Sequence, residues 1–522
     1  MLFSKNTHYY LYLSGLILIA ISLPVSRFAL SVSQFILLGN WLLEFNFSEK
    51  FERIKKKKSL LIFLSIFLIH LIGLIYTKDI QTGFFDIKIK APLLLLPLII
   101  VSSNSLDFKQ IKIIFLFFAA STFVATLISS TLLFGFTNHE IIQNTEISIF
   151  INHISFSVLI NISVFFLLYL IFYKWDSLIK AEKFIYPIII IWLSVFLFFL
   201  QSMTGIFILF VAGFVFIFNI IYRLNNIKIK YLLFIVLFSF PVLSSVLTIK
   251  TVVNFYSYKE AIDKNTIDKY TKHGNPYTHL LDSKTTENGY FLYLYICKKE
   301  LREEWNKISK IDFDGFDKNG QKMQHTLVRY LTSKGLRKDY EGINKLDSID
   351  ISFIEKGYAN CICRKKYSIS PLIYKIVWQI DIYLKGSKPE GHSILQRIKS
   401  IEIAFDIIKE NFLFGVGSGD MNYEFKEYYK KHNMKFVEHL STVGANQFIS
   451  FFVKFGFLGF LWIIYAFVSP VFIENKQNNY FLFLFLFIIL LAMFSEEILK
   501  FQTGVTYFSF FYSLFLFTNN KK

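Results

Sequence analysis

The sequence predicts an all-α polytopic membrane protein with about twelve transmembrane helices and one mixed α+β extracytoplasmic loop domain. Of its 522 residues, 54% are hydrophobic and only 18% are charged, and the mean hydropathy is +0.46. Long uncharged apolar runs recur along the chain, and one long polar segment, 248–444, interrupts them. A soluble core does not need so much apolar surface, whereas spanning helices do.

The apolar runs have the composition expected of spanning helices, which need roughly twenty residues each. They are 9–23, 28–43, 59–76, 87–101, 111–134, 149–172, 184–200, 205–221, 231–247, 445–468, 480–494 and 504–517. The polar segment divides the chain into an N-terminal bundle of about nine helices, 1–247, the loop domain, 248–444, and a C-terminal group of about three helices, 445–522.

The basic residues predict the orientation of these helices. A net charge of +18 would suggest a nucleic-acid partner in a soluble protein, but here the lysines and arginines lie between apolar runs. With twelve spans, the basic connections all fall on one side: 45–58, 102–112, 173–183, 222–230 and 469–479. The loop 135–146, on the other side, has no lysine or arginine. The positive-inside rule therefore predicts cytoplasmic termini, an outer loop domain and no nucleic-acid partner.

The loop domain is rich in Lys, Asp, Glu, Tyr and Asn and contains several turn signals. The run Gly289-Tyr-Phe-Leu-Tyr-Leu-Tyr-Ile296 predicts a strand, and the charged residues after it, up to Lys307, predict a helix. His325 to Tyr330 predicts the core of another helix, which ends near Gly335. We therefore expect a domain that mixes helices with strands.

The three cysteines, Cys297, Cys361 and Cys363, all lie in the loop domain. An odd count cannot pair fully, so we expect at most one disulfide, which would join Cys297 to one of the other two. The Cys361-Ile-Cys363 pair has no second pair at zinc spacing. The acidic turn 312–317 lacks the residue order of a calcium-binding EF-hand and its closing glutamate. We therefore expect no metal site.

The C-terminal part contains a distinctive order of motifs. An amphipathic run that carries Arg397 precedes the glycine-rich run Asn411-Phe-Leu-Phe-Gly-Val-Gly-Ser-Gly419. Asn446-Gln-Phe-Ile449 and Phe455-Gly-Phe-Leu-Gly459 then lie at the entry to the next span. This order resembles the O-antigen ligase/polymerase family of polytopic membrane glycan transferases.

Weaker likenesses to the family lie in Ile87–Pro97 and Asn152–Ser157, so that the resemblance covers most of the chain. The long insert is similar to a subset of the family with an enlarged periplasmic loop domain. Two positions depart from the family pattern: Ala445 stands where the family has a histidine, and Met203 stands where it has an arginine.

The resemblance implies transfer of a glycan from a polyprenyl (undecaprenyl) diphosphate carrier at the periplasmic face of a bacterial inner membrane, in lipopolysaccharide or surface polysaccharide biosynthesis. The partners it implies are the lipid-linked glycan donor, a lipid A-core or glycan acceptor, and membrane lipids, with no cofactor. An O-antigen polymerase and a protein O-glycosyltransferase are alternatives within the family. A polysaccharide transporter or flippase and a non-catalytic assembly protein are alternatives of another class.

A diphosphate beside lipid needs arginine or lysine side chains and backbone N–H donors. On this ground and by the resemblance, the candidate substrate-binding residues are Arg397, Lys88, Lys90, Gly415, Gly417, Gly419 and Asn446. The glycines would form an anion-binding nest, or else a simple turn between two helices with Asp420 as N-cap. The basic side chains would bind phosphate, or else extend along the membrane surface.

His439, His392 and His153 are the candidate catalytic residues, because histidine accepts protons near neutral pH. Each of them would otherwise be a hydrogen-bonded structural residue. Lys454 is an ionised residue within a predicted span, and such residues are functional candidates by default. Glu496-Glu497 is expected to mark the outer end of the span before it.

Overall fold

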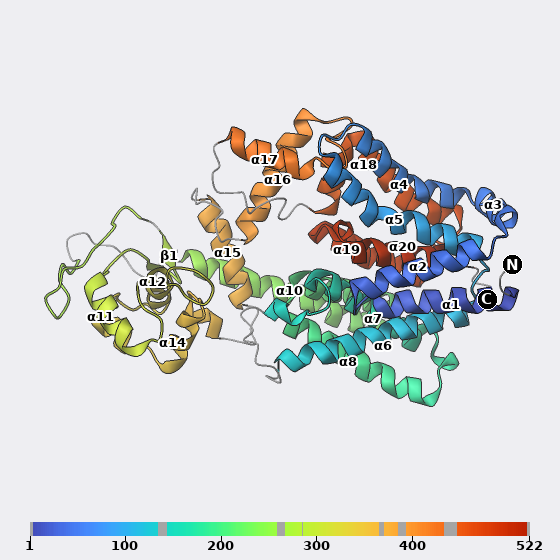
Figure 1. Ribbon diagram of the computed structural model, residues 1–522. Helices are drawn as coiled ribbons and strands as arrows, with labels where there is room; N and C mark the ends of the chain where they lie inside the picture. Colours follow the sequence, from blue (N-terminus) through green and yellow to red (C-terminus); the bar gives the residue numbers. More distant parts are fainter. Residues whose placement is uncertain are drawn as a thin grey trace. The chain divides into compact units, whose positions relative to one another are not determined.

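The computed structural model describes residues 4–133, 144–257, 267–283, 285–364, 370–384, 393–432 and 446–518 (Figure 1). The chain separates into two compact units. Unit 1 consists of Met1–Arg223 and Gln396–Lys522, and unit 2 consists of Leu224–Leu395.

Unit 1 is helical throughout its described part. Its helices are α1 (Lys5–Ser22), α2 (Arg27–Leu43), α3 (Phe47–Lys56), α4 (Lys58–Ile75), α5 (Ile80–Ser102), α6 (Phe108–Leu133), η1 (Asn144–Ile147), α7 (His153–Tyr173), η2 (Trp175–Ser177), α8 (Lys180–Leu200), α9 (Met203–Tyr222), α16 (Ser393–Glu410), α17 (Met421–Lys431), α18 (Gln447–Ile473), α19 (Tyr480–Ser495), η4 (Ile498–Lys500) and α20 (Gln502–Phe517).

Each of the predicted apolar runs largely coincides with one helix, but not all of these helices qualify as spans. Seven are long and apolar enough to cross a membrane: α4, α6, α7, α8, α9, α10 (Ile227–Tyr256) and α18. The helices α2 and α3 are long and apolar enough only if they are counted as one span, and they are bent by 110° relative to each other. The described helices therefore provide at most eight candidate spans. These helices indicate a membrane protein.

The predicted count of twelve spans is not confirmed, for reasons visible in the remaining helices. The first turn of α1 is polar, and α5 carries Asp86, Lys88 and Lys90 in its first half. The helices α2, α19 and α20 have only 17, 16 and 16 residues. A helix of 16 residues rises about 24 Å, which is less than the hydrocarbon thickness of about 30 Å.

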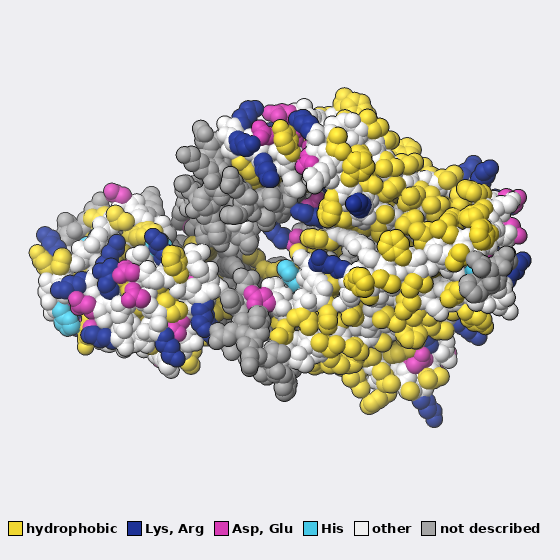
Figure 2. Space-filling view, in the orientation of Figure 1, with side chains coloured by type: hydrophobic (Ala, Val, Ile, Leu, Met, Phe, Trp, Pro, Cys, Tyr) yellow, Lys and Arg dark blue, Asp and Glu magenta, His cyan; other side chains and the backbone are white. Residues whose placement is uncertain are grey.

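Two helices form the centre of unit 1. The side chains of α7 and α20 are buried on all faces, as expected for helices that are apolar all round. Aromatic rings join them to their neighbours: the centroid of Phe115 lies 4.4 Å from that of Phe166 and 4.6 Å from that of Phe511. Figure 2 shows that hydrophobic side chains also cover much of the visible surface of unit 1.

Helix ends that were predicted to share one side of the membrane do contact one another. The Nζ of Lys57 before α4 lies 2.6 Å from the carboxylate of Glu474 after α18. Lys112 of α6 pairs with Glu182 of α8 at 2.8 Å. At the opposite ends of α4 and α18, which pack side by side (Figure 1), a second group of charged residues gathers. The structure thus shows which of these ends lie together, and their sidedness and in–out orientation stay predictions.

Unit 2 contains α10, the strands β1 (Thr286–Glu287) and β2 (Tyr290–Phe291), and six further helices. These are α11 (Lys298–Ile308), α12 (Met323–Ser333), α13 (Tyr340–Asn344), α14 (Ser348–Glu355), η3 (Cys361–Arg364) and α15 (Ser370–Leu384). The core is formed by large buried side chains, among them Trp305 and Tyr330. The predicted boundaries of the loop domain at 247 and 444 stay predictions.

The helices predicted in this unit are confirmed as α11 and α12, and the latter ends just before Gly335, which has a φ of 69°. The predicted strand 289–296 is mostly not a strand: Tyr290–Phe291 pairs with Thr286–Glu287, and Ile296 forms only isolated bridges, to Thr278 and Lys338. The unit is therefore mainly helical, with little sheet. Both residues of the hairpin turn, Asn288 and Gly289, have positive φ, as a tight two-residue hairpin requires.

All three cysteines are free thiols, so neither of the disulfides that the sequence allowed is formed. Cys297 is buried, and its burial raises the pKa of the thiol, which keeps it in the unreactive protonated form.

Candidate functional site

A buried group of charged side chains connects α4, α5 and α18, and we name it the Asp86 cluster: His70, Asp86, Lys90 and Lys454. The Nδ1 of His70 lies 2.8 Å from one carboxylate oxygen of Asp86. The ammonium groups of Lys90 and Lys454 each lie 3.2 Å from the other oxygen. The carboxylate thus holds three helices together. Burying an ionised group costs several kcal/mol of folding free energy unless a partner of opposite charge lies beside it. Each charge in the cluster therefore needs its partner.

The cluster extends to the turn between α19 and α20. Lys90 donates a second hydrogen bond, of 2.7 Å, to the carbonyl oxygen of Leu499. Glu497 accepts a hydrogen bond from the hydroxyl of Ser450 and pairs with Lys500 at 3.7 Å. Two acceptors of the protein thus bind the buried ammonium of Lys90.

The glycine-rich run, residues 411–420, is a tight connection between α16 and α17, which we name the glycine turn. Its N–H groups are bonded to the protein: that of Gly415 to Asn411 O at 3.0 Å, that of Gly417 to Lys454 O at 2.9 Å, and that of Gly419 to the Thr77 hydroxyl at 2.9 Å. An anion nest needs free N–H groups. The three candidate glycines therefore serve close packing in this structure rather than ligand binding.

Close approach explains why glycine occupies these positions. A Cβ on Gly417 would lie 2.8 Å from the carbonyl oxygen of Gly73, and one on Gly419 would lie 2.3 Å from that of Asp79. Gly415 and Gly417 have φ values of 71° and 101°, which glycine adopts without strain. The glycine turn thus lies directly against the end of α4 and the start of α5.

Asp420 was considered as the N-cap of the helix after the glycine turn, but its side chain does not cap α17. Its carboxylate oxygens instead accept hydrogen bonds of 2.7 Å from the N–H groups of Lys78 and Asp79. Asp420 therefore ties the glycine turn to the chain that leads into α5.

Arg397 of α16 lies at the end of α19. Its guanidinium pairs with the carboxylate of Glu496 and donates a hydrogen bond of 3.3 Å to the carbonyl oxygen of Ser495. The side chain keeps an exposed fraction of 42%. His153, the first residue of α7, is within the electrostatic influence of Arg397. The charge of one candidate residue therefore acts on another.

The remaining candidates in unit 1 differ in how accessible they are. Lys88 is exposed and lines a surface hollow with Ile80, Gln81, Phe84 and Phe85 of α5. Lys90 is buried in the Asp86 cluster. Asn446 is the N-cap of α18, where its side-chain oxygen accepts a hydrogen bond of 2.9 Å from the N–H of Ile449. Of these three residues, Lys88 is the best placed to meet a ligand.

Four positions that the sequence singled out remain. His392, His439 and Ala445 lie outside the described residues. Met203 is the first residue of α9, follows its N-cap Ser202, and is exposed.

Sequence reasoning missed His70 and Asp86, the two residues at the centre of the cluster. Asp86 lies just before the predicted apolar run 87–101, although Asp86 and Lys90 have the i, i+4 spacing of an ion pair on one helix. Asp79, whose side chain caps α5, was the signal that this helix begins before the apolar run. His70 stands alone in an apolar run, and nothing local indicated its partner.

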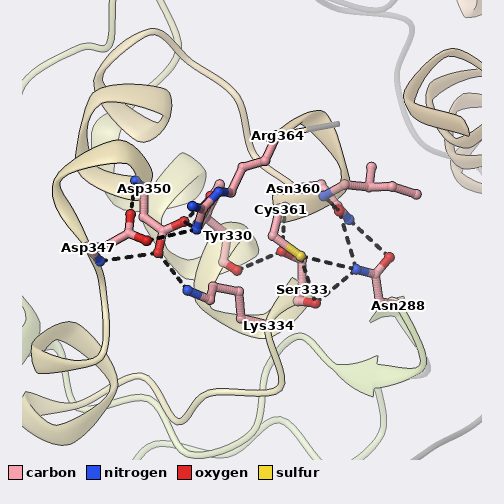
Figure 3. Close-up of polar contacts among 10 residues, drawn as sticks. Asn288, Tyr330, Ser333, Lys334, Asp347, Asp350, Asn360, Cys361 and Arg364 are labelled. Carbon is pink, nitrogen blue, oxygen red and sulfur yellow. Dashed lines mark hydrogen bonds and ion pairs between the residues drawn. The ribbon is translucent and has the colours of Figure 1, made fainter. Parts of the chain in front are cut away.

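Unit 2 contains a second buried polar network, around Asp350 (Figure 3). The carboxylate of Asp350 accepts hydrogen bonds from Tyr330 at 2.5 Å, Lys334 at 2.6 Å and Arg364 at 2.8 Å. Arg364 also bonds Asp347 at 3.0 Å. In the same view, Asn288 bonds the carbonyl oxygen of Ser333 at 2.8 Å, next to Cys361. These contacts join α12, α14 and η3.

Glu287 is the centre of a similar network nearby. Its carboxylate pairs with Arg329 at 2.6 Å and accepts hydrogen bonds from Asn360, at 3.0 Å, and Tyr374. Arg329 also stacks on the ring of Trp378, 3.8 Å from its centroid. Because protein donors occupy both oxygens of Glu287, this network stabilises unit 2 and offers no ligand site.

The Asp350 network predicts acid sensitivity. Burial alone raises the pKa of Asp350, but the hydrogen bonds from Lys334 and Tyr330 outweigh it and hold the pKa below its usual range. A depressed pKa stabilises the fold above the unfolded value, about pH 4, and this stability is lost as the pH falls through the folded value. We expect hydrogen exchange of α12 and α14 in the full-length protein to accelerate below about pH 4.

The matched variants are Asp350→Asn and Asp282→Asn, since Asp282 is exposed. Asp350→Asn leaves the cations of the network without their buried partner, and we expect it to cost about 3 kcal/mol at neutral pH. The acid-induced acceleration should largely vanish in this variant and persist in Asp282→Asn. Equal exchange in the two variants at neutral pH would contradict the assignment.

No group of three or more His, Cys, Asp or Glu side chains is placed to hold a metal ion within the described ranges. No protein-family model matches the sequence, and no curated protein matches it. The site therefore has to be judged on its own geometry.

Proposed function

We propose that this protein is a membrane glycan transferase similar to O-antigen ligases. It moves a glycan from a polyprenyl diphosphate to an acceptor at the outer face of a bacterial inner membrane. The acceptor hydroxyl attacks the anomeric carbon, the carbon–oxygen bond to the diphosphate breaks, and the carrier diphosphate leaves. The proposal includes cytoplasmic termini and an outer segment 248–444, which a reporter fused at Lys318 tests: activity only in the cytoplasm would refute it.

The position of Arg397 is the observation that carries the proposal. Its half-exposed guanidinium lies where α16 and the end of α19 meet, and its charge acts on His153 at the start of α7. Guanidinium binds phosphate oxygens through two parallel hydrogen bonds, and such charge-assisted bonds are strong beside lipid. In this structure the guanidinium of Arg397 binds the carboxylate of Glu496. A diphosphate would take the place of this carboxylate, since both are anions with oxygen acceptors.

The other candidate residues support the proposal to different degrees. Exposed Lys88 supplies a second positive charge for the diphosphate. Lys90, with its ammonium engaged, contributes by fixing α5 in place. His153, within the electrostatic influence of Arg397, is the described histidine best placed to accept the proton of the acceptor hydroxyl.

We predict that Arg397→Ala lowers glycan transfer about ten- to several-hundred-fold. One charge-assisted hydrogen bond contributes about 1.5–3 kcal/mol and a second at the half-exposed guanidinium adds less, so the loss is about 1.5–4 kcal/mol in total, at about 1.4 kcal/mol for each tenfold. Arg397→Lys keeps the charge without the fork and should recover part of the rate. The measurement is surface glycan in a deletion strain that expresses each variant, with protein level checked by immunoblot.

Glu496→Gln is the matched control, because it removes the same ion pair but leaves Arg397 available. If Arg397 binds the diphosphate, Glu496→Gln retains transfer while Arg397→Ala loses it. If the ion pair is only structural, both variants fail alike. Wild-type transfer by normally expressed Arg397→Ala would exclude the site.

A transporter or flippase remains the second candidate, because the buried Asp86 cluster is the kind of ionisable group found along transport pathways. Lipid-linked intermediates in a deletion strain distinguish the classes. Full-length chains that accumulate outside indicate a ligase, single repeat units outside indicate a polymerase, and donors that stay in the cytoplasmic leaflet indicate a flippase.

A further inference from the structure

The Asp86 cluster has one property that a purely structural role does not require. The Nε2 of His70 is buried and has no hydrogen-bond partner within the described part of the chain. Buried polar side-chain atoms nearly always have a partner. Because an ionised carboxylate has no hydrogen to give, the Nδ1 of His70 carries the hydrogen that it shares with Asp86. The Nε2 is then a bare nitrogen lone pair, which is an unoccupied proton acceptor.

The charges around this pair are balanced when His70 is neutral, since two carboxylates face two ammonium groups. The ionisable groups that face the pair come from α4, α5, α18 and the turn before α20: His70, Asp86, Lys90, Lys454, Glu497 and, on the outer side of Glu497, Lys500. A balanced cluster of this kind does not attract a multivalent anion. Its state changes, however, with a single added proton.

The cluster is partly exposed at one edge. The side chains of Asp86 and Lys454 keep exposed fractions of 12% and 13%, whereas those of Lys90 and His70 keep 2% and 1%. The carboxylate therefore lies at the edge of the cluster and the imidazole lies inside. The hydrogen bond from Nδ1 to this carboxylate fixes the imidazole, so a proton added at Nε2 changes the charge directly beside Asp86.

We propose that the His70–Asp86 pair is an exchangeable proton-binding site. One proton from water is taken up at the Nε2 of His70, while Nδ1 keeps its hydrogen bond to Asp86 and no bond between heavy atoms forms or breaks. The net charge of the pair changes from −1 to zero, so the attraction that holds Lys454 and Lys90 weakens. This inference does not depend on the proposed glycan transfer.

Lys454 carries the effect to the glycine turn. Its ammonium bonds Asp86, and its carbonyl oxygen accepts the N–H of Gly417 at 2.9 Å. Two residues further on, α18 is kinked at Gly456. The carbonyl oxygen of His70 also accepts a hydrogen bond of 2.6 Å from Ser418. Proton uptake is therefore expected to loosen the first turns of α18 against the glycine turn.

The test uses full-length protein in lipid nanodiscs and hydrogen exchange of the peptide 447–458, corrected for the intrinsic effect of pH. In wild type we expect exchange to accelerate about tenfold between about pH 7 and pH 4, the range that covers the titration of histidine and carboxyl side chains. His70→Gln should abolish this acceleration, and His432→Gln, which changes an exposed histidine at the end of α17, should retain it.

A second measurement, on wild-type protein, tests the proposal even if a variant folds poorly. In wild-type protein with ¹⁵N-labelled histidine, one imidazole should show a change of protonation that is absent from the charge-balanced double variant Asp86→Leu/Lys454→Met. Exchange that is independent of pH in wild type, or the same acceleration in His70→Gln, would overturn the proposal. An unchanged histidine spectrum over the whole range would do so too.

Discussion

Replacing Asp86 with leucine is expected to leave little folded protein, whereas adding Lys454→Met to the same chain is expected to restore much of the loss. In Asp86→Leu, Lys90 and Lys454 face Glu497 alone and one buried positive charge is uncompensated. Breaking a buried ion pair from one side costs about 3–5 kcal/mol, while replacing both partners by apolar groups is often nearly neutral. The double variant leaves Lys90 opposite Glu497, and the charges balance again.

The measurement is thermal unfolding of the four proteins of this cycle in detergent, followed by size-exclusion chromatography. We expect Lys454→Met alone to be destabilised as well, since it leaves an excess negative charge. The coupling between the two positions should be roughly 2 kcal/mol or more and favourable. If the two single effects add to within about 0.5 kcal/mol, the pair does not carry the stability assigned to it.

The sequence predicted the helices well and their partners poorly, and the Asp86 cluster shows why. Apolar runs predict helices because a helix in lipid satisfies its own backbone groups, which depends only on local sequence. The contact between Asp86 and Lys454 joins residues 368 positions apart. Such a contact depends on how α4, α5 and α18 pack, and no local pattern encodes that packing.

The candidate site was predicted to a similar degree. Arg397 lies on α16, which coincides with the predicted amphipathic run. Its partner Glu496 was expected only to mark the end of a helix. The glycines of the glycine turn were correctly placed in a tight connection, and their N–H acceptors were not predictable, because they come from α18 and from the chain between α4 and α5. The strand predicted in unit 2 was too long, because the alternating aromatic residues from Gly289 to Ile296 resemble the pattern of a strand.

The glycine in the kink of α18 provides the second prediction. Gly456 has a φ of 63° and a ψ of −169°, a region that only glycine adopts readily. A Cβ there would lie 2.4 Å from backbone atoms of Leu413 and Phe414, so the glycine turn would have to shift. We expect Gly456→Ala to cost about 2–6 kcal/mol, which combines backbone strain with overpacking. Little folded protein should then be recovered from the membrane.

Gly39→Ala is the matched control, because Gly39 lies inside α2 and a Cβ there meets no atom within 4 Å. Alanine is favoured over glycine within a helix by about 0.5–1 kcal/mol, so this variant should be slightly more stable than wild type. The two substitutions are chemically identical and are expected to have opposite signs. Equal melting temperatures for Gly456→Ala and wild type would show that α18 can straighten, and that the contact between its kink and the glycine turn does not hold the site in place.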